Sequence, residues 1–122
     1  MTTNKHIRHE ESALQRNCVK WFRYQWDIYA LNLIAIPNGG ARNLVEAAIM
    51  KGEGVTAGAA DLFLFVPNSR YHGLAIEMKS PSGTWRDTQK RWAKAIEDRG
   101  YKYILVRSFE QFVSEVNQYL NS

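Results

Sequence analysis

The feature that most constrains the fold is a pair of apolar runs that lie close together in the chain. Residues 61–66 read DLFLFV and residues 73–79 read GLAIEMK. Apolar side chains occupy both alternating sets of positions in each run, which is typical of strands buried on both faces of a sheet. The intervening Pro67, Asn68 and Ser69 favour a turn. The sequence therefore predicts an antiparallel hairpin in the middle of a sheet.

The register of this hairpin follows from its turn. If the turn is symmetric about Ser69, every apolar residue of one run pairs with an apolar residue of the other, and Asp61 pairs with Glu77. Because side chains alternate between faces, Asp61, Glu77 and Lys79 then share one face. A shift of a single residue would separate the two acids. This register thus predicts two adjacent carboxylates with an amine nearby.

Adjacent carboxylates repel each other and are costly to bury, so their proximity needs an explanation. Mg²⁺ or Mn²⁺ would supply one, because a hard cation takes one or two carboxylates together with water or phosphate oxygens. The backbone carbonyl of Met78 lies at the same level of the strand and is a further candidate ligand. Lys79 would stabilise negative charge on a phosphate group and orient an attacking water molecule. The alternative is an exposed ion pair between Glu77 and Lys79 on an edge strand, which the apolar character of both runs disfavours.

Helical and strand patterns surround the hairpin. We expect helices at residues 10–24, 41–52, 85–99 and 109–120, and further strands at 28–37 and 101–107. Thr84 is expected to cap the third helix and Gly100 to end it, whereas Ser108 and Gln111 would form a capping box for the last helix. In the second helix the inward-facing residues would be Leu44, Val45, Ala48 and Ile49. This order predicts an α/β fold with a mixed central sheet flanked by helices.

The length and composition agree with such a fold. The 122 residues fit one compact domain, residues 1–122, and 45% of them are hydrophobic. No apolar run approaches the length of a membrane span, and the first residues lack the apolar stretch of a secretion signal. Cys18 is the one cysteine and cannot form an internal disulfide, which suits a reducing compartment. We therefore expect a cytoplasmic protein without membrane contact.

Basic residues gather in the C-terminal part of the chain. Between residues 79 and 107 there are eight lysines and arginines but three acids, within a chain of net charge +4. Arg86, Lys90 and Lys94 would lie on the outward side of the third helix, where they could follow a phosphate backbone. The alternative is that these charges only keep the helix soluble. Asn38 and the two glycines after it would either let the backbone approach a phosphate or form a plain turn.

Taken together, these motifs resemble the PD-(D/E)XK nuclease superfamily. Gly58-x-x-Asp61, an apolar strand and Glu77-x-Lys79 carry the likeness. It is stronger to the VRR-NUC branch, small domains found alone in phages or fused to larger repair nucleases. The further shared features, spread over nearly the whole chain, are Glu11-x-x-x-Gln15, Pro37-Asn38-Gly39-Gly40, Arg42, Gly54 and Gln89. One departure is Ala60, which stands where the superfamily pattern has a proline, although many members lack that proline as well.

The resemblance implies a restriction-endonuclease-like fold with an αβββαβ core. It also implies that Asp61 and Glu77 bind the metal, and that Lys79 is the catalytic lysine. Glu11 would reach the metal from the first helix, and Gln89 would be the residue of the third helix that touches the catalytic site or the DNA. The likeness to VRR-NUC proteins further implies a homodimer and a preference for branched or junction DNA. The residues expected to contact the nucleic acid are then Asn38, Arg42, Arg86, Lys90 and Lys94.

Two of these assignments have support of their own. Gln89 lies on the same helical stripe as Trp92, so it should point inward, where a buried amide needs hydrogen-bond partners. The alternative partner for Gln89 is the backbone. Glu11 shares a helix face with Gln15, but an acid is also favoured near a helix N-terminus by the helix dipole, and Glu10 would satisfy that preference equally well.

The residues and the resemblance together predict a metal-dependent endonuclease that hydrolyses DNA phosphodiester bonds. A rival prediction is a DNA-binding module without catalysis, part of a phage or repair complex, which would keep the basic helix and need no metal. An RNA-directed nuclease would differ from the first prediction in its substrate only. Metal binding separates the first two predictions, and a side-by-side screen of nucleic acid structures addresses the third.

Overall fold

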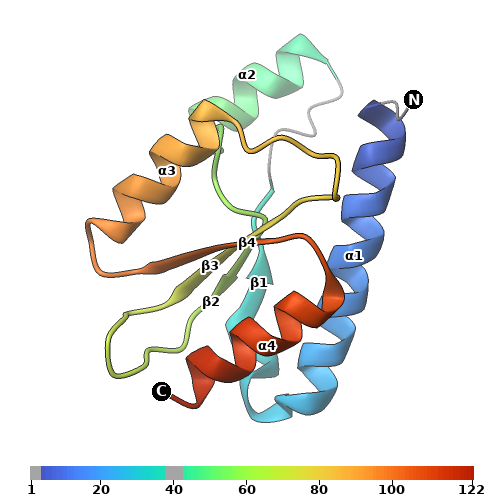
Figure 1. The fold of residues 1–122 in the computed structure, drawn as a ribbon. Helices are drawn as coiled ribbons and strands as arrows, with labels where there is room; N and C mark the ends of the chain where they lie inside the picture. Colours follow the sequence, from blue (N-terminus) through green and yellow to red (C-terminus); the bar gives the residue numbers. More distant parts are fainter. Residues whose placement is uncertain (1–3, 38–42) are drawn as a thin grey trace.

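A computed structural model describes residues 4–37 and 43–122, and within them four strands form one sheet (Figure 1). The strands are β1 (Leu33–Ala35), β2 (Leu62–Leu64), β3 (Leu74–Met78) and β4 (Lys102–Val106), and they lie in the order β1-β2-β3-β4. β2 pairs antiparallel with both β1 and β3, whereas β3 and β4 are parallel. The sheet is therefore mixed, as predicted, with β3 at an interior position.

The register of the β2–β3 hairpin is the predicted one. Leu62 pairs with Ile76, and Phe63 pairs with Ala75. The large ring of Phe63 thus lies opposite a small side chain, which suits packing on that face. The strands themselves are shorter than the apolar runs, because the chain leaves β2 after Leu64. A nine-residue loop, residues 65–73, then leads into β3.

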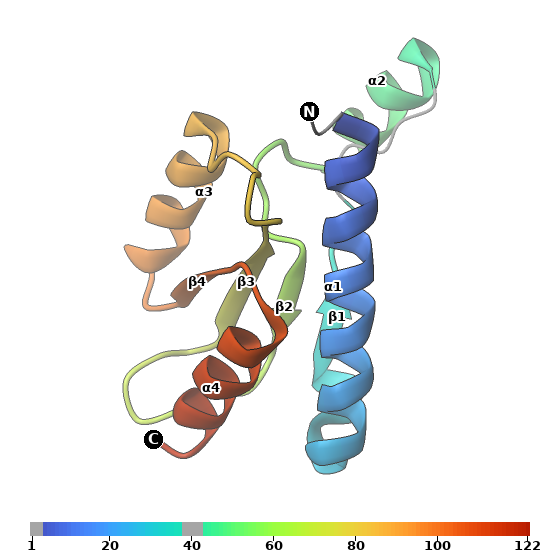
Figure 2. The same ribbon diagram turned by 45° about the vertical axis from the view of Figure 1, so that its right-hand side comes forward.

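One face of the sheet is covered by α1 (Asn4–Gln25) and α4 (Phe109–Leu120), as Figure 2 shows. The side chains buried between them and the sheet include Phe22, Phe112, Val116, Leu62, Leu64, Ile76 and Met78. Each such fully buried side chain stabilises the fold by about 1.5–3 kcal/mol relative to exposure. This layer is the main core, and it holds the C-terminal half of α1 against the sheet through residues between Leu14 and Phe22.

The other face is covered in part by α3 (Asp87–Glu97), which lies across the sheet from α1 (Figure 2). Its Trp92 and Ile96 pack against a small cluster that includes Phe63 and Ala75. Because Glu77 alternates with Ile76 and Met78 along β3, its side chain lies on this α3 face. The charged residues at the open end of the hairpin therefore lie on the side of the sheet that faces α3, and not on the side of the main core.

The predicted strand at residues 28–37 is largely wrong. Residues Asp27–Asn32 form a 3₁₀ helix, η1, and only Leu33–Ala35 pair in the sheet. The cause is aromatic packing at the end of α1, where Trp26 stacks on Tyr29 and its indole N–H donates to Asn117 Oδ1 at 2.9 Å. These tertiary contacts hold the chain in a helical turn, although its alternating pattern favours a strand.

The predicted orientation of the second helix is also wrong. Helix α2 (Leu44–Gly52) exists, but Leu44, Val45 and Ile49 are 89%, 70% and 55% exposed, and Ala48 is exposed as well. Figure 2 shows α2 standing clear of the sheet beyond its upper end. Among the described residues, none covers the apolar side chains of this helix.

Two helix caps differ from the sequence prediction in detail. Helix α3 begins at Asp87 rather than after Thr84, and Gln89 Oε1 accepts the N–H of Arg86 at 2.9 Å in place of a Thr84 cap. Ser108 caps α4 as predicted, since its Oγ accepts the N–H of Gln111 at 3.1 Å. The returning bond of the capping box is displaced by one residue, because the Gln111 side chain accepts from the residue before Ser108.

None of the helices in the described part of the chain combines the length and the apolar composition needed to cross a membrane.

Candidate functional site

The candidate site lies at the edge of the sheet where β2 begins and β3 ends. Asp61 directly precedes β2, Glu77 is in β3, and Lys79 follows β3 by one residue. Because the two strands are antiparallel, these positions lie side by side. Asp61 Oδ2 accepts the backbone N–H of Met78 at 2.7 Å. The Asp61 carboxylate thus accepts the Met78 N–H just beyond the end of β2, where a backbone carbonyl would otherwise accept it. This hydrogen bond fixes the carboxylate against β3.

Glu77 is almost fully buried, with 2% of its surface exposed. One carboxylate oxygen, Oε2, accepts a hydrogen bond from Gln89 Nε2 at 3.1 Å. The other, Oε1, is the one buried side-chain oxygen or nitrogen without a hydrogen-bond partner in residues 4–37 and 43–122. Buried polar atoms are nearly always paired, and an unpaired one costs free energy. This oxygen is therefore the atom of the site that a proton shared with the Asp61 carboxylate, or a bound cation, would satisfy.

The electrostatics of Glu77 agree with this geometry. Burial, followed by the charge and hydrogen bonding of the Asp61 carboxylate, raises the pKa of Glu77 from its ordinary value of 4.5 to about 9. The positive charge of Lys79 acts in the opposite direction, and the Glu11 carboxylate adds a smaller upward contribution. With no cation bound, Glu77 therefore holds a proton at neutral pH.

Lys79 brings a positive charge to the site and is only 6% exposed. Its backbone N–H donates to the carbonyl of Val106 at 2.8 Å, which extends the β3–β4 ladder by one step. No acidic side chain among the described residues forms an ion pair with it. The backbone of Lys79 is thus fixed against β4, while its ammonium group forms no ion pair with a described carboxylate.

Glycine at position 83 makes room for two of these side chains. A Cβ atom there would lie 2.6 Å from Glu11 Oε2 and 3.3 Å from Lys79 Cδ. Both distances are shorter than ordinary contacts of a Cβ atom. The side chains of Glu11 and Lys79 therefore pass over Gly83, and any larger residue would displace one of them.

Of the two acids at the start of α1, the structure brings Glu11 to the site. Glu11 Oε2 accepts the backbone N–H of Ser80 at 3.1 Å. Glu10 instead lies 2.6 Å from His6 Nε2, measured from its Oε1 atom. Within the described ranges, no group of three or more His, Cys, Asp or Glu side chains gathers to hold a metal ion. The close carboxylate pair is thus Asp61 and Glu77, with Glu11 bound to the backbone beside it.

Gln89 links the start of α3 to the site. Its Oε1 accepts the N–H of Arg86, while its Nε2 donates to Glu77. The loop before Asp61 contacts the same turn of α3, because Gly58, at φ +87°, lies so close to Thr88 that an added Cβ would overlap its carbonyl group. The predicted inward orientation of Gln89 is therefore observed, and both of the alternatives weighed for its amide, the site and the backbone, are used at once.

The residues expected to contact nucleic acid fall into two groups. Arg86, Lys90 and Lys94 are exposed on α3, although Lys90 lies 3.9 Å from Asp87 and Lys94 lies 3.2 Å from Asp98. Lys90 Nζ also lies 5.4 Å from the centre of the Trp85 ring. The other two, Asn38 and Arg42, lie outside the described residues.

Tyr103 and Arg107 lie near the site, and the motif analysis did not identify either of them. The Tyr103 hydroxyl accepts the indole N–H of Trp85 at 3.2 Å, and burial, together with the charge of Glu77, raises the pKa of Tyr103. Strand alternation could have located Tyr103, because it pairs with Ala75 and shares the face of Glu77. Arg107 carries no such signal, since its contacts are with backbone carbonyls distant in the sequence.

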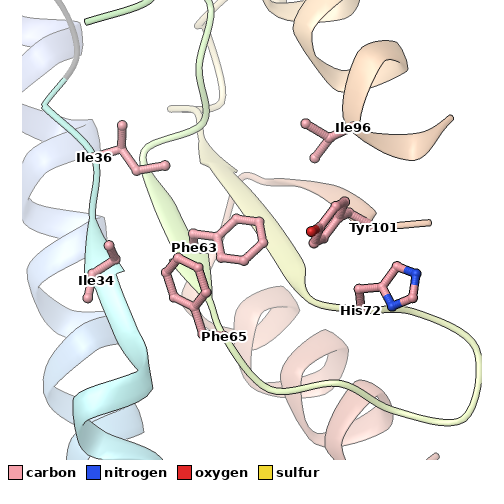
Figure 3. A pocket seen from close by; sticks show the side chains of 7 residues that line it. All are labelled: Ile34, Ile36, Phe63, Phe65, His72, Ile96 and Tyr101. Carbon is pink, nitrogen blue, oxygen red and sulfur yellow. The ribbon is translucent and has the colours of Figure 1, made fainter. Parts of the chain in front are cut away.

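An apolar hollow lies elsewhere on the α3 face. Figure 3 shows Ile34 and Phe65 on one side of it and Ile96 and Tyr101 on the other, around a volume of about 400 Å³. Its lining contains no acidic residue, lysine or arginine. This hollow is therefore distinct from the polar site at the strand ends.

The fold and the site together define an α/β protein with a mixed four-stranded sheet, in which two carboxylates and a lysine lie at the ends of neighbouring strands. The VRR-NUC domain family matches residues 3–110, so the chain belongs to the VRR-NUC family. A solved structure described as a VRR_NUC domain protein is 25% identical and superposes with a TM-score of 0.79, covering 91% of this chain and 88% of that one. No curated protein matches the chain. Family membership indicates a nuclease-type module that processes DNA.

Proposed function

We propose that the protein is an endonuclease that hydrolyses DNA phosphodiester bonds with the help of Mg²⁺ or Mn²⁺. The observation that carries the proposal is the buried, unpartnered Oε1 atom of Glu77 beside the Asp61 carboxylate. A buried carboxylate beside a half-buried one is unfavourable without a counter-charge, and here the nearby Lys79 does not form an ion pair with either acid. A divalent cation would remove the conflict for both acids.

The residues present suit such a cation. Asp61 and Glu77 would hold it through carboxylate oxygens, which Mg²⁺ and Mn²⁺ prefer. The carbonyl of Met78 points to the same side of β3 as its N–H, which donates to Asp61, so this carbonyl faces the same position. Once bound, the ion would supply Lewis acidity toward a phosphate oxygen and lower the pKa of a bound water. Glu11 is bound to the Ser80 N–H, so we do not count it among the direct ligands in this conformation.

The chain's own side chains would then take distinct roles. Lys79 would stabilise the negative charge that develops on the phosphate, because a charge held in a water-poor position acts more strongly than one in bulk water. Gln89 would keep the Glu77 carboxylate in one orientation through its hydrogen bond to Oε2. Arg86, Lys90 and Lys94, together with Asn38 and Arg42, would follow the DNA backbone.

We further propose that two copies act together on branched or junction DNA. Two strands must be cut to resolve a symmetric junction, and a two-fold dimer presents two equivalent sites for the purpose. The family likeness supports this proposal, and the exposed basic row on α3 is compatible with a substrate that offers phosphates on several arms.

The test is cleavage of Holliday junctions, flaps, splayed arms, plain duplex and single-stranded RNA, each with Mg²⁺, Mn²⁺ or EDTA. We expect metal-dependent cleavage of a branched DNA, and loss of that cleavage in Glu77→Ala and Lys79→Ala. The matched controls, Glu53→Ala and Lys20→Ala, change exposed residues away from the site and should cleave normally. DNA binding without cleavage under every condition would instead favour the non-catalytic module, for which the basic row on α3 would suffice.

A further inference from the structure

A tight turn separates Lys79 from the helix that carries Gln89. In this turn, residues 80–83, the N–H of Gly83 donates to the carbonyl of Ser80 at 3.0 Å. Ser80 directly follows Lys79 and is buried. Since Gly83 of this turn lies against the stem of Lys79, the position of the turn restricts where that side chain can lie.

Arg107 binds both ends of this turn. Its Nη1 atom donates to the carbonyl of Ser80 at 2.8 Å and to the carbonyl of Gly83 at 2.9 Å. Hydrogen bonds from a charged donor are shorter and stronger than neutral ones. In the described part of the chain Arg107 forms no ion pair with an acid. Its charge is thus directed at two backbone carbonyls.

Arg107 is itself held firmly by the start of α4. Its backbone N–H donates to Gln111 Oε1 at 2.8 Å, and Gln111 Nε2 donates to the carbonyl of Leu105 at 2.8 Å. Arg107 also follows Val106, whose carbonyl accepts the N–H of Lys79. A continuous set of hydrogen bonds therefore runs from α4 through Arg107 to the lysine and its turn.

The opposite side of the turn is held by an acid. Glu11 accepts the N–H of Ser80, and its carboxylate and the stem of Lys79 share the space above Gly83. Arg107 thus binds two carbonyls on one side of the turn, and Glu11 binds an N–H on the other side. This arrangement leaves the turn little freedom to move, and it restricts the position of Lys79, which directly precedes the turn.

We propose that Arg107 is a positioning residue for DNA cleavage, which directs Lys79 toward the scissile phosphate by fixing the turn at residues 80–83. The inference rests on the proposed function. It makes no claim that Arg107 touches DNA or metal. A displacement of about 1 Å at a reacting group can lower a rate about a hundredfold, so a small movement of the turn is sufficient.

The experiment compares Arg107→Ala and Arg107→Lys with the matched control Arg99→Ala, which removes an exposed arginine from the same basic segment. For each variant we would measure single-turnover cleavage, DNA affinity with its salt dependence, Mn²⁺ affinity, and amide hydrogen exchange at Ser80 and Gly83 in the metal-free protein. We expect Arg107→Ala to cleave about 10- to 100-fold more slowly, with DNA and Mn²⁺ affinities within about twofold of wild type. Exchange at both amides should rise about tenfold or more, because the turn opens more often.

Rescue separates positioning from general destabilisation. Guanidinium ion in the assay should restore part of the rate of Arg107→Ala, and Arg107→Lys should retain more activity than Arg107→Ala because it keeps one charged donor. An unchanged cleavage rate or unchanged amide exchange in Arg107→Ala would overturn the inference. A loss confined to DNA affinity, with a smaller salt dependence, would overturn it too, since Arg107 would then be a phosphate contact.

These outcomes differ from failure of the proposed function. If the wild-type protein cuts no nucleic acid with any metal, the proposed function is wrong and a role for Arg107 in cleavage is wrong with it. If the wild type cuts DNA and Arg107→Ala cuts equally fast, the inference alone is wrong. Should Arg107→Ala fail to fold, the rate and exchange of Arg107→Lys decide between the same results.

Discussion

Replacing Glu77 with glutamine should stabilise the metal-free protein while removing the function proposed for it. Glutamine has the shape of glutamate, and its side-chain oxygen can still accept the hydrogen bond from Gln89. Its amide cannot ionise, and the NH₂ group can donate to the Asp61 carboxylate, which lies beside Glu77. Above the ordinary pKa of a glutamate, the substitution therefore removes the free-energy cost of protonating Glu77 on folding, and it supplies a permanent donor beside the Asp61 carboxylate.

The size of the effect follows from the pKa of Glu77, which rises from 4.5 in its ordinary state to about 9 in the folded protein. Between these two values the folded state binds more protons than the unfolded state, so the free energy of unfolding falls as the pH rises. The slope is about 1.4 kcal/mol for each pH unit. From about pH 5.5 to about pH 8, Glu77 should thus remove about 3 kcal/mol from the stability of the wild type.

The assay is urea unfolding in EDTA at about pH 5.5 and about pH 8, for wild type, Glu77→Gln and the exposed control Glu53→Gln. We expect Glu77→Gln to gain stability relative to wild type as the pH rises, by about 3 kcal/mol over this range, and the control to follow the wild type. Other titrating groups change all three proteins alike, so the difference isolates position 77.

The reasoning would be refuted by a stability difference between wild type and Glu77→Gln that is the same at both pH values. Addition of Mn²⁺ supplies an independent check, since a ligand that binds the folded state alone raises its stability. Mn²⁺ should stabilise the wild type and leave Glu77→Gln unchanged. Equal stabilisation of both proteins would place the ion elsewhere.

Three further substitutions test other parts of the structure. Gly58→Ala should lower the free energy of unfolding, measured in urea, by about 2 kcal/mol or more, because it adds a Cβ at positive φ against the first turn of α3. The control Gly52→Ala places its Cβ in open space and should be neutral or slightly stabilising. Gly83→Ala should lower the cleavage rate while Mn²⁺ affinity, measured by calorimetry, stays near that of wild type, because the added methyl group displaces the Glu11 carboxylate and crowds the stem of Lys79 without meeting Asp61 or Glu77. Leu44→Ala should change stability by less than about 0.5 kcal/mol, since the side chain is exposed on α2; a loss of 2 kcal/mol or more would show that it is buried.

The hairpin was predictable because its pattern admits one register. Slipping the strands by one residue would have paired Asp61 with an apolar partner and turned the apolar residues to the other face, and the observed pairing of Phe63 with Ala75 is the one that matches large with small. The proximity of Asp61 to Glu77 follows directly from that register. The metal-binding role of these residues stays a prediction.

Other features depend on contacts that no local pattern contains. The η1 helix exists because Trp26 reaches Asn117, 91 residues away, and none of the described residues covers the apolar side chains of α2. The choice between Glu10 and Glu11 was likewise decided by a partner far along the chain, the N–H of Ser80. Periodicity locates a helix and its apolar face but does not say what lies opposite that face.

The candidate site is gathered from both ends of the sequence. The bond between Glu11 and Ser80 spans 69 positions, and Arg107 reaches back to the same turn across 27. A chain still being synthesised would have Asp61 and Glu77 well before it has Arg107, and without Val106 the backbone of Lys79 would lack its partner. If the proposed cleavage depends on these contacts, a nascent or truncated chain would lack them, and the activity would appear only when folding is complete.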